Sequence, residues 1–396
     1  MNPEHPGLSG RPIYLDYNAT TPVDPQVVAA MAPFLTTEFG NPSSSHEYGQ
    51  PPRDALLRAR RQVAALIGAS GEEIVFTGSG SEADALAVRG AVLAALAAGR
   101  DQVHLITQVT EHPAVLAAGR ELQRWHRVEV SYLPVDGDGV VDPDDVAAAI
   151  TADTVLVSVM HANNETGTLQ RIADIAEVTH SHGVLLHTDA AQSVGKVPVD
   201  VDLLGVDLLT VVGHKMYAPK GIAALYVRGD VSLHPLVGGG GQEHGLRAGT
   251  ENVALAVALG EAADLAASAL AAGESTRLAG LRDGLADWLE ELVPARIHVH
   301  GHHTRRLPNT LNLRLDGVAA LPLLAATPDI AASTGSACHA GRGEPSGVLL
   351  AMGVPPDAAM SAIRLSAGRW TQPTDVKRAA AALAEAARAG AGSGAR

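Results

Sequence analysis

Short apolar runs alternate with longer stretches of helical periodicity over the first two-thirds of the chain. Apolar runs that have the length of buried strands span 73–77, 103–109, 154–160, 184–187, 208–212 and 222–227. Helical periodicity fills the intervals 81–98, 113–126 and 172–182. This regular alternation predicts an α/β fold with a mostly parallel sheet that is covered by helices on both faces.

The pattern changes after about residue 260. An Ala- and Leu-rich stretch over 261–291 predicts one long helix, and the alternating segments IHVHG and TLNLRLDG predict half-exposed strands. A last helix is expected over 373–389. We therefore expect four parts. They are a flexible N-terminal segment, 1–12, part of which packs on the small domain; a large α/β domain, 13–260; a small α+β domain, 261–389; and a flexible tail, 390–396.

The composition suits a globular protein and narrows its partners. Of the 396 residues, 46% are hydrophobic and 18% are charged, and the net charge is −14. An acidic chain without a Lys/Arg run disfavours binding to nucleic acid or to an anionic membrane. No apolar run reaches the ~20 residues that span a bilayer. The polar N-terminus does not resemble a secretory signal, and one cysteine cannot form an internal disulfide, so we expect a cytoplasmic protein.

Polar residues follow the predicted strands at their carboxyl ends, where open parallel sheets bind ligands. The strand at 73–77 runs into Gly80 and Ser81 at the start of a helix. Such a glycine-rich turn presents backbone N–H groups and the positive end of a helix dipole, which suit a phosphate. The sequence from Ser81 to Asp84 also resembles a capping box, so an ordinary capped helix is the alternative.

The other strand ends carry an imidazole, amides, a carboxylate and an amine. These groups belong to His112, Asn163, Asn164, Asp189, Gln192 and Lys215. Taken alone, Asp189 also suits a helix N-cap. Together with a phosphate turn, the set predicts pyridoxal 5'-phosphate, which needs a lysine for its Schiff base and an acid beside its pyridinium nitrogen.

The chain resembles a known family over nearly its whole length. The motifs that carry the resemblance are YLDYNATTP, GNPSSSHEYG, FTGSGSEAD, TEHPAV, HANNETG, HTDAAQSVGK, VGHKMYAPKG, GGGQEHGLRAGTEN, GSACHAG and IRLSAGR. They are similar to those of the cysteine desulfurases, which belong to the fold-type-I, class V aminotransferase group. VGHK, RLPNT and ACH are also similar to the selenocysteine lyases of that group. The resemblance implies a fold-type-I transferase that depends on pyridoxal phosphate.

The resemblance implies a role for each matching residue. Lys215 would form the Schiff base and move the Cα proton of the substrate, and His112 would stack on the cofactor ring and assist proton transfers. Asp189 would pair with the ring nitrogen, and Gln192 would bond the phenolic oxygen. Asn164 would lie beside that oxygen and the substrate carboxylate.

The phosphate and the substrate would be held by further residues that the resemblance implies. Gly80, Ser81 and His214 would hold the phosphate. Thr250 would complete that site from the neighbouring subunit, which implies a homodimer. Arg364 would bind the substrate carboxylate through its guanidinium, although a structural ion pair would also suit an arginine there. No metal is expected.

The chain departs from the commonest family pattern at three positions. Val212 stands where a serine usually precedes GHK, so one hydroxyl donor to the phosphate is lost, as selenocysteine lyases tolerate. Ser81 replaces a threonine but keeps the hydroxyl group. His244 replaces a common arginine, which puts an anion contact there in doubt.

The single cysteine, Cys338, lies in STGSACHAGRGEPSG (333–347), a stretch of small and flexible residues. A spare surface thiol would be an oxidation liability. The resemblance implies that Cys338 takes the sulfur of L-cysteine as a persulfide and passes it to an acceptor, in iron–sulfur cluster assembly or thiolation. His339 beside it would favour the thiolate when protonated.

Three functions follow from this sequence. The first is a cysteine desulfurase that uses Cys338 covalently. The second is a selenocysteine lyase, which shares almost every residue with the first. The third is a non-catalytic scaffold that docks iron–sulfur assembly partners, which intact Lys215, Asp189, His112 and Arg364 disfavour.

Overall fold

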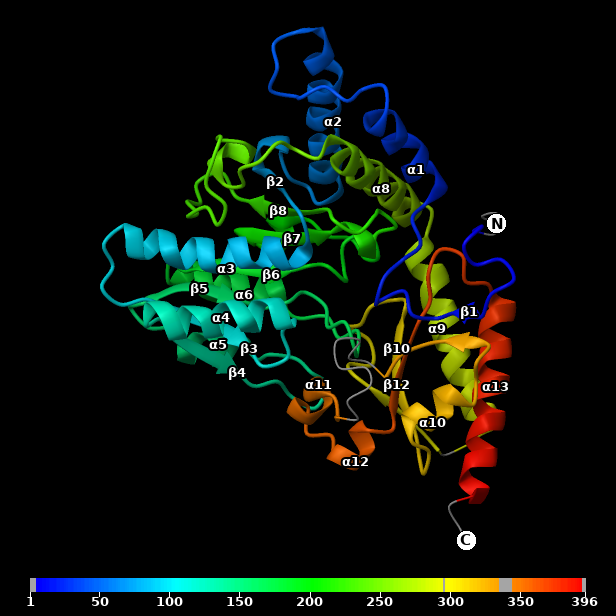
Figure 1. The fold of residues 1–396 in the computed structure, drawn as a ribbon. Helices are drawn as coiled ribbons and strands as arrows, with labels where there is room; N and C mark the ends of the chain where they lie inside the picture. Colours follow the sequence, from blue (N-terminus) through cyan, green and yellow to red (C-terminus); the bar gives the residue numbers. More distant parts are fainter. Residues whose placement is uncertain (1–4, 295, 335–343, 394–396) are drawn as a thin grey trace.

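The computed structural model describes residues 5–294, 296–334 and 344–393 (Figure 1). Its largest element is a seven-stranded sheet with the strand order β2-β8-β7-β6-β5-β3-β4. The strands are β2 (Ile74–Thr77), β3 (His104–Gln108), β4 (Glu129–Leu133), β5 (Thr154–Ser158), β6 (Leu185–Asp189), β7 (Leu208–Val212) and β8 (Ala223–Val227). Only the two pairs that involve β8 are antiparallel. The predicted α/β fold with a mostly parallel sheet is therefore confirmed.

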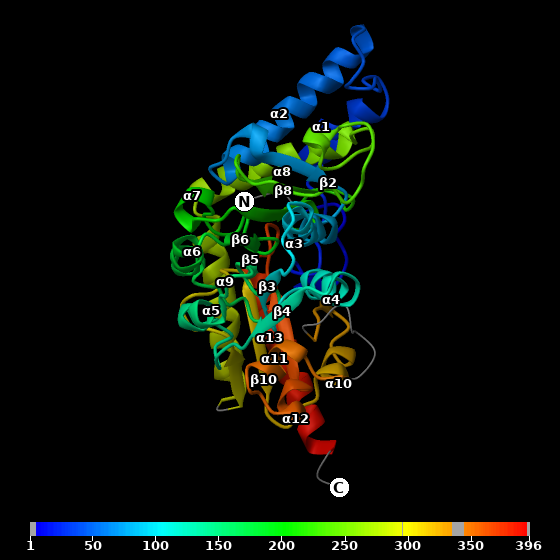
Figure 2. The same cartoon turned by 90° about the vertical axis from the view of Figure 1, so that its left-hand side faces the viewer.

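Helices cover both faces of this sheet, as Figure 2 shows. On one face lie α3 (Gly80–Ala97) and α4 (Pro113–His126), and on the other lie α5 (Pro143–Ala149), α6 (Ile172–Ser181) and α7 (Val201–Leu204). Strands β2, β3, β7 and β8 are buried along their whole length. A strand that is covered on both faces has no polar side to expose, which explains the nearly continuous apolar runs.

A helical layer at one end of the sheet is formed by α1 (Pro25–Met31), α2 (Gln50–Leu66) and α8 (Val253–Ala271) (Figure 1). Helices α2 and α8 cross closely, because a Cβ on Gly260 would lie 2.7 Å from the Cα of Ala59. Among the described residues, α8 is the one helix long and apolar enough to cross a membrane. Half of its apolar window is buried inside the fold, as in the core helix of a globular protein.

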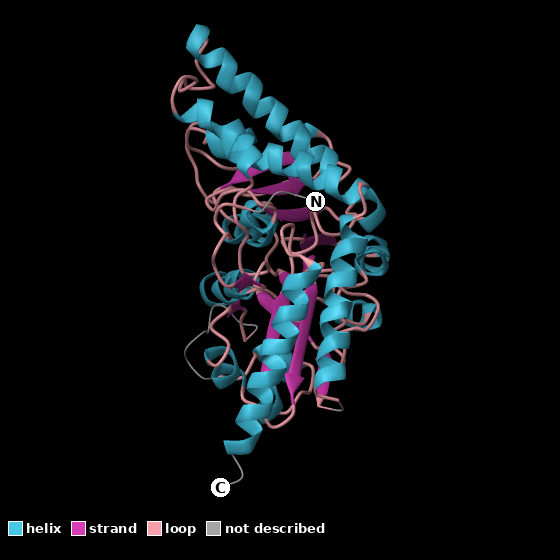
Figure 3. Cartoon of the chain, turned by 90° about the vertical axis from the view of Figure 1, so that its right-hand side faces the viewer, coloured by secondary structure: helices cyan, strands magenta, loops and turns pink. Residues whose placement is uncertain are grey.

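A second hydrophobic core surrounds an antiparallel sheet with the order β12-β10-β9. Its strands are β9 (Ile297–His300), β10 (Thr310–Leu315) and β12 (Ala362–Ser366). Two long helices, α9 (Glu274–Leu292) and α13 (Pro373–Ser393), pack side by side against it (Figure 3). The other strands and α-helices of the described residues are β1 (Ile13–Tyr14), which pairs with β11 (Ile330–Ala331), and the short helices α10 (Ala320–Ala325), α11 (Gly347–Ala351) and α12 (Pro356–Ala359).

The structure differs from the sequence prediction after residue 250. The single helix expected over 261–291 is wrong, because the chain breaks at Gly273, which has φ +85°, between α8 and α9. Helix α8 runs through residue 260 and contributes to the core of the large sheet, so the change between the two cores falls at Gly273. Helix α13 extends to Ser393, four residues beyond the predicted end at 389.

Candidate functional site

A cavity of about 770 Å³ opens at the carboxyl ends of the parallel strands. Residues from both sheets and from the segment after β1 line it. Nine of the residues singled out in the sequence are among them: Gly80, Ser81, His112, Asn164, Asp189, Gln192, His214, Lys215 and Arg364. Its volume is that of a pocket for a small molecule or cofactor.

Lys215 lies at the end of the 3-10 turn Gly213–Lys215 that follows β7. Its Nζ donates hydrogen bonds to two backbone carbonyls, those of Asn18 (2.6 Å) and Ala19 (2.9 Å). Both carbonyls belong to the segment after β1, and Asn18 and Ala19 line the cavity. Asn18 fixes this segment through its N–H to Ser366 Oγ (3.0 Å) and its side-chain amide to Thr310 Oγ1 (2.8 Å).

Asp189 at the end of β6 is the carboxylate that the sequence placed at this rim. It is buried, and its Oδ1 accepts the N–H of Ala191 at 2.9 Å. Burial raises its pKa, while His112 and Lys215 oppose that shift. Burial also lowers the pKa of His112, so its imidazole is neutral near pH 7. Asp189 therefore offers a buried carboxylate beside a neutral imidazole.

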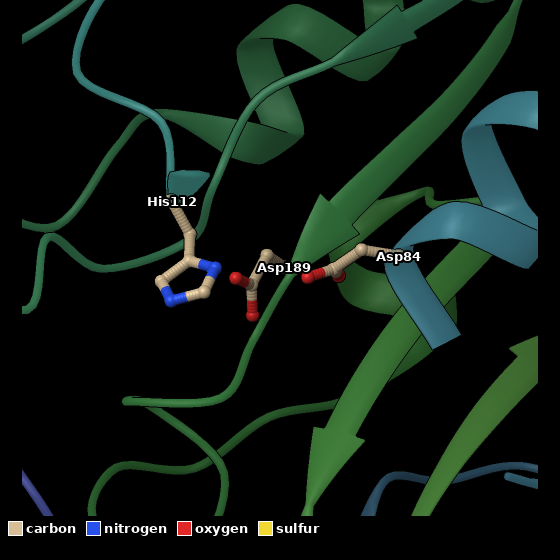
Figure 4. A group of neighbouring side chains, drawn as sticks. All are labelled: Asp84, His112 and Asp189. Atoms are coloured by element: carbon tan, nitrogen blue, oxygen red, sulfur yellow. The ribbon is translucent and has the colours of Figure 1, made fainter. Parts of the chain in front are cut away.

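Asp84 also lines the cavity, and Figure 4 shows its side chain next to those of Asp189 and His112. One donor atom each from Asp84, His112 and Asp189 lies within 4.8 Å of the others. A metal would tolerate this spacing, and the expectation that the chain binds none stays a prediction. Burial, followed by the charge of Asp189, raises the pKa of Asp84 well above its ordinary value.

The turn between β2 and α3 has the features of an anion site. Ser79 is the N-cap of α3, with extended backbone angles and an Oγ that accepts the N–H of Glu82 at 3.2 Å. The predicted helix start at Ser81 is thus wrong by one residue, since Gly80 is already helical. The N–H groups of this first turn have no partner within the helix.

Val212 and His214 flank that turn. A Cβ on Gly80 would lie 2.6 Å from a methyl of Val212, so only a glycine permits this contact. The Nδ1 of His214 contacts Thr20 Oγ1 at 3.1 Å. Burial first, and then the charge of Lys215, lowers the pKa of His214 to about 4. His214 therefore meets this turn as a neutral hydrogen-bonding group at neutral pH.

Arg364 on β12 of the three-stranded sheet lines the cavity and is almost fully buried. Its guanidinium donates to Asp16 Oδ1 at 2.7 Å and to the carbonyl of Asn164 at 2.9 Å. The structural ion pair, which was the alternative role for Arg364 in the sequence analysis, is therefore present. Arg364 also lines the cavity. An ion pair of this kind fixes the position of the guanidinium.

Two predicted residues of the described ranges, Asn163 and Thr250, do not line the cavity. Thr250 is exposed in the segment before α8 and does not line the cavity. Cys338 lies outside the described residues. The described residues on either side of it are close to the cavity, since Ser333 pairs through its backbone with Arg364 (2.7 Å) and Glu344 lines the wall.

The sequence reasoning missed several residues that line the cavity. They are Asn18, Ala19, Asp84, Glu111, Glu165 and Lys220. Asn18 lies in YLDYNATTP and Glu111 in TEHPAV, so the family motifs contained a signal for both. Asp84 was explained as part of a capping box, and nothing in its spacing indicates burial.

Residues 13–379 match the family model described as aminotransferase class-V. The chain is 47% identical over 368 residues to "Cysteine desulfurase IscS" of Anaeromyxobacter dehalogenans (strain 2CP-C), an alignment that covers 92% of this chain and 90% of the relative. It is 46% identical over 380 residues to the protein of the same name from Azotobacter vinelandii, covering 95% and 92%.

Solved structures agree with these sequence relatives. A "NIFS-LIKE PROTEIN" superposes with a TM-score of 0.87 at 32% identity, covering 94% of this chain and 98% of that one. The structure called "SspA in complex with cysteine" has a TM-score of 0.78 at 35% identity, covering 89% and 98%. DndA from Streptomyces lividans has a TM-score of 0.73 at 34% identity, covering 88% and 97%.

Proposed function

The chain belongs to the cysteine desulfurases of the aminotransferase class-V family, and from this premise we propose how its own residues carry the reaction. The chain binds pyridoxal 5'-phosphate in the cavity and transfers the sulfur of L-cysteine to Cys338. The products are L-alanine and a persulfide on Cys338. The C–S bond of cysteine breaks and an S–S bond forms at Cys338, so atoms and electrons balance without an added oxidant.

The residues of the cavity fit this cofactor. Asp189 offers a buried carboxylate for a protonated ring nitrogen, and Gln192 offers an amide for the phenolic oxygen. The first turn of α3, with Gly80 and Ser81, and the side chain of His214 offer donors for a phosphate. When bound, the cofactor supplies an electron sink for the bond that breaks at the substrate Cα.

Lys215 and Arg364 orient and deprotonate the substrate. The guanidinium of Arg364, held by Asp16, binds the substrate carboxylate, and the lysine moves the Cα proton through Nζ. The two backbone carbonyls that accept hydrogen bonds from Nζ hold the amine at the cavity before it reacts. His112, neutral at physiological pH, lies beside Asp189 and assists the proton transfers.

One observation carries the sulfur-transfer step. The chain on both sides of the segment that contains Cys338 lies at the cavity: Ser333 is bonded to the backbone of Arg364, and Glu344 and Pro345 line the wall. The described residues on both sides of this segment therefore lie at the substrate site, which supports Cys338 as the acceptor of the sulfur. The persulfide then has to pass to an acceptor protein.

Kinetics of the wild type and of Cys338→Ala on L-cysteine and on L-selenocysteine test this function. The variant keeps the yellow colour of the bound cofactor but loses sulfide release from cysteine. Full activity of the variant on cysteine contradicts the persulfide step. A wild type that acts on selenocysteine alone is a selenocysteine lyase, and a wild type that stays colourless with added pyridoxal phosphate contradicts the cofactor.

Assembly and location complete the proposal. Thr250 is exposed and outside its own cavity, which suits a contribution to the phosphate site of a second copy in a homodimer. The persulfide passes to a sulfur-acceptor or iron–sulfur scaffold protein. We expect this exchange in the cytoplasm, where thiols stay reduced.

A further inference from the structure

Lys196 is a buried lysine that the proposed reaction does not use. It follows Gln192 by four residues in the turn after β6, and the residue is 8% exposed. Its Nζ donates to the side-chain Oε1 of Gln192 at 2.8 Å and to the backbone carbonyl of the same residue at 3.0 Å. Within the described ranges it forms no ion pair, so both of its hydrogen bonds serve Gln192.

These contacts determine which way the amide of Gln192 points. The Nζ of Lys196 donates to Oε1, and the backbone carbonyl of Asn18 can only accept. With Oε1 held by Lys196, the amide nitrogen faces the other way and donates to the carbonyl of Asn18 at 3.0 Å. A flipped amide would set its oxygen against the carbonyl oxygen of Asn18 and lose both hydrogen bonds, so the neighbours favour one orientation.

The same carbonyl connects Gln192 to Lys215. The oxygen of Asn18 accepts from Gln192 Nε2 and also from Lys215 Nζ at 2.6 Å. Lys196, Gln192, Asn18 and Lys215 therefore form one chain of hydrogen bonds that ends at the cavity. The amide nitrogen bonds to Asn18, and both Asn18 and Gln192 line the cavity.

We propose that Lys196 is a positioning residue that holds Gln192 with its N–H₂ group toward the cavity, ready to donate to an anionic oxygen of the bound cofactor. Without Lys196 the amide is free to rotate and to present its oxygen to that anion. The proposal rests on the proposed function, because it concerns the same cofactor site. Burying a lysine here costs free energy of folding, since burial and the charges of Lys215 and Arg364 lower its pKa well below the ordinary value. A role in the site explains why a lysine is present.

A double-mutant cycle tests the proposal, with cofactor-free protein titrated with pyridoxal phosphate. We expect Lys196→Met to weaken cofactor binding about tenfold in the wild-type background. In the Gln192→Ala background the same change has no further effect, because the residue that it positions is gone. Lys196→Arg keeps a hydrogen-bond donor and retains most of the affinity for the cofactor. This variant tests the proposal even if Lys196→Met does not fold. The pH at which the visible absorbance of the bound cofactor changes gives a second readout.

A purely structural role for Lys196 gives a different result. Lys196→Met would then lower affinity equally in both backgrounds, and that outcome overturns the proposal, as does unchanged affinity in the single variant. Ser275→Ala is the matched control, because Ser275 Oγ donates to the backbone carbonyl of Lys196 at 2.6 Å. It lowers thermal stability but not cofactor affinity. If the wild type itself does not bind pyridoxal phosphate, that result contradicts the proposed function. It does not contradict the role of Lys196.

Discussion

A carboxylate oxygen of Asp84 lies within 4.8 Å of one from Asp189, and both side chains are buried. Two carboxylates at this distance in a buried site do not both ionise, because each charge raises the pKa of the other. Asp189 has the better support for a charge, from the N–H of Ala191 and from His112 and Lys215. Asp84 therefore keeps the proton, and Asp189 carries the charge that the ring nitrogen of the proposed cofactor would require.

Replacing Asp84 by asparagine tests this division of charge. Since the folded-state pKa of Asp84 is raised, its contribution to stability is complete below about pH 4 and is lost as the pH rises toward the raised pKa. Asp84→Asn removes this loss. We expect the cofactor-free variant to gain about 1–2 kcal/mol relative to the wild type between pH 4 and pH 8, measured as a pH-dependent difference in melting temperature.

Asp54→Asn is the control for this measurement. Asp54 is an exposed acidic residue on α2, so its replacement leaves the pH dependence of melting as in the wild type. A difference between Asp84→Asn and the wild type that stays constant from pH 4 to pH 8 means that Asp84 ionises like an ordinary aspartate. The charge in the site would then not belong to Asp189 alone.

The sequence predicted the place of the cavity and nine of the residues that line it, because the rule for strand ends depends on topology. Once the alternation of strands and helices is known, the carboxyl ends of parallel strands meet at one edge, and His112, Asp189 and Lys215 follow from their positions. The break at Gly273 was not predicted, because Ala- and Leu-rich residues on both sides of it favour a helix equally. A single glycine is a weak signal within such a run.

The residues that were missed depend on packing between distant segments. Asp84 lies one turn into a helix whose start shows a capping pattern, and only the position of α3 on the sheet brings it against Asp189. Lys196 lies in a family motif, yet its task is visible only when Gln192 and Asn18 are placed. Contacts across 174 residues of sequence are not encoded in spacing.

Arg364 gives a prediction about substrate affinity. We expect Arg364→Lys to raise the KM for L-cysteine about 10–100-fold, because an ammonium does not bind a carboxylate through two parallel hydrogen bonds. Cofactor affinity changes little, and steady-state alanine formation measures the effect. Asp16→Asn, which keeps the guanidinium but weakens its anchor, gives a smaller increase in KM. An unchanged KM in Arg364→Lys would assign the arginine to the ion pair alone.

Glu243 is expected to stabilise the segment that carries Thr250. Its carboxylate accepts from both terminal nitrogens of Arg60 (2.7 Å each) and from the N–H of Phe76 (2.7 Å), all of them buried. Glu243 and His244 also have left-handed backbone angles, with φ +50° and +57°, so other interactions must hold the turn. Glu243→Gln leaves a buried guanidinium without its counter-charge, and we expect a loss of about 3 kcal/mol in the free energy of unfolding.

An exposed ion pair of the same chain is the control for Glu243→Gln. Arg171 and Asp174 pair on the surface, where their side chains are 43% and 46% exposed. Asp174→Asn therefore changes stability by less than about 0.5 kcal/mol. If Thr250 serves the phosphate site of a second copy, Glu243→Gln also weakens cofactor binding in the dimer, whereas Asp174→Asn does not. A Glu243→Gln variant that melts like the wild type would show that Arg60 and the turn are held by other contacts.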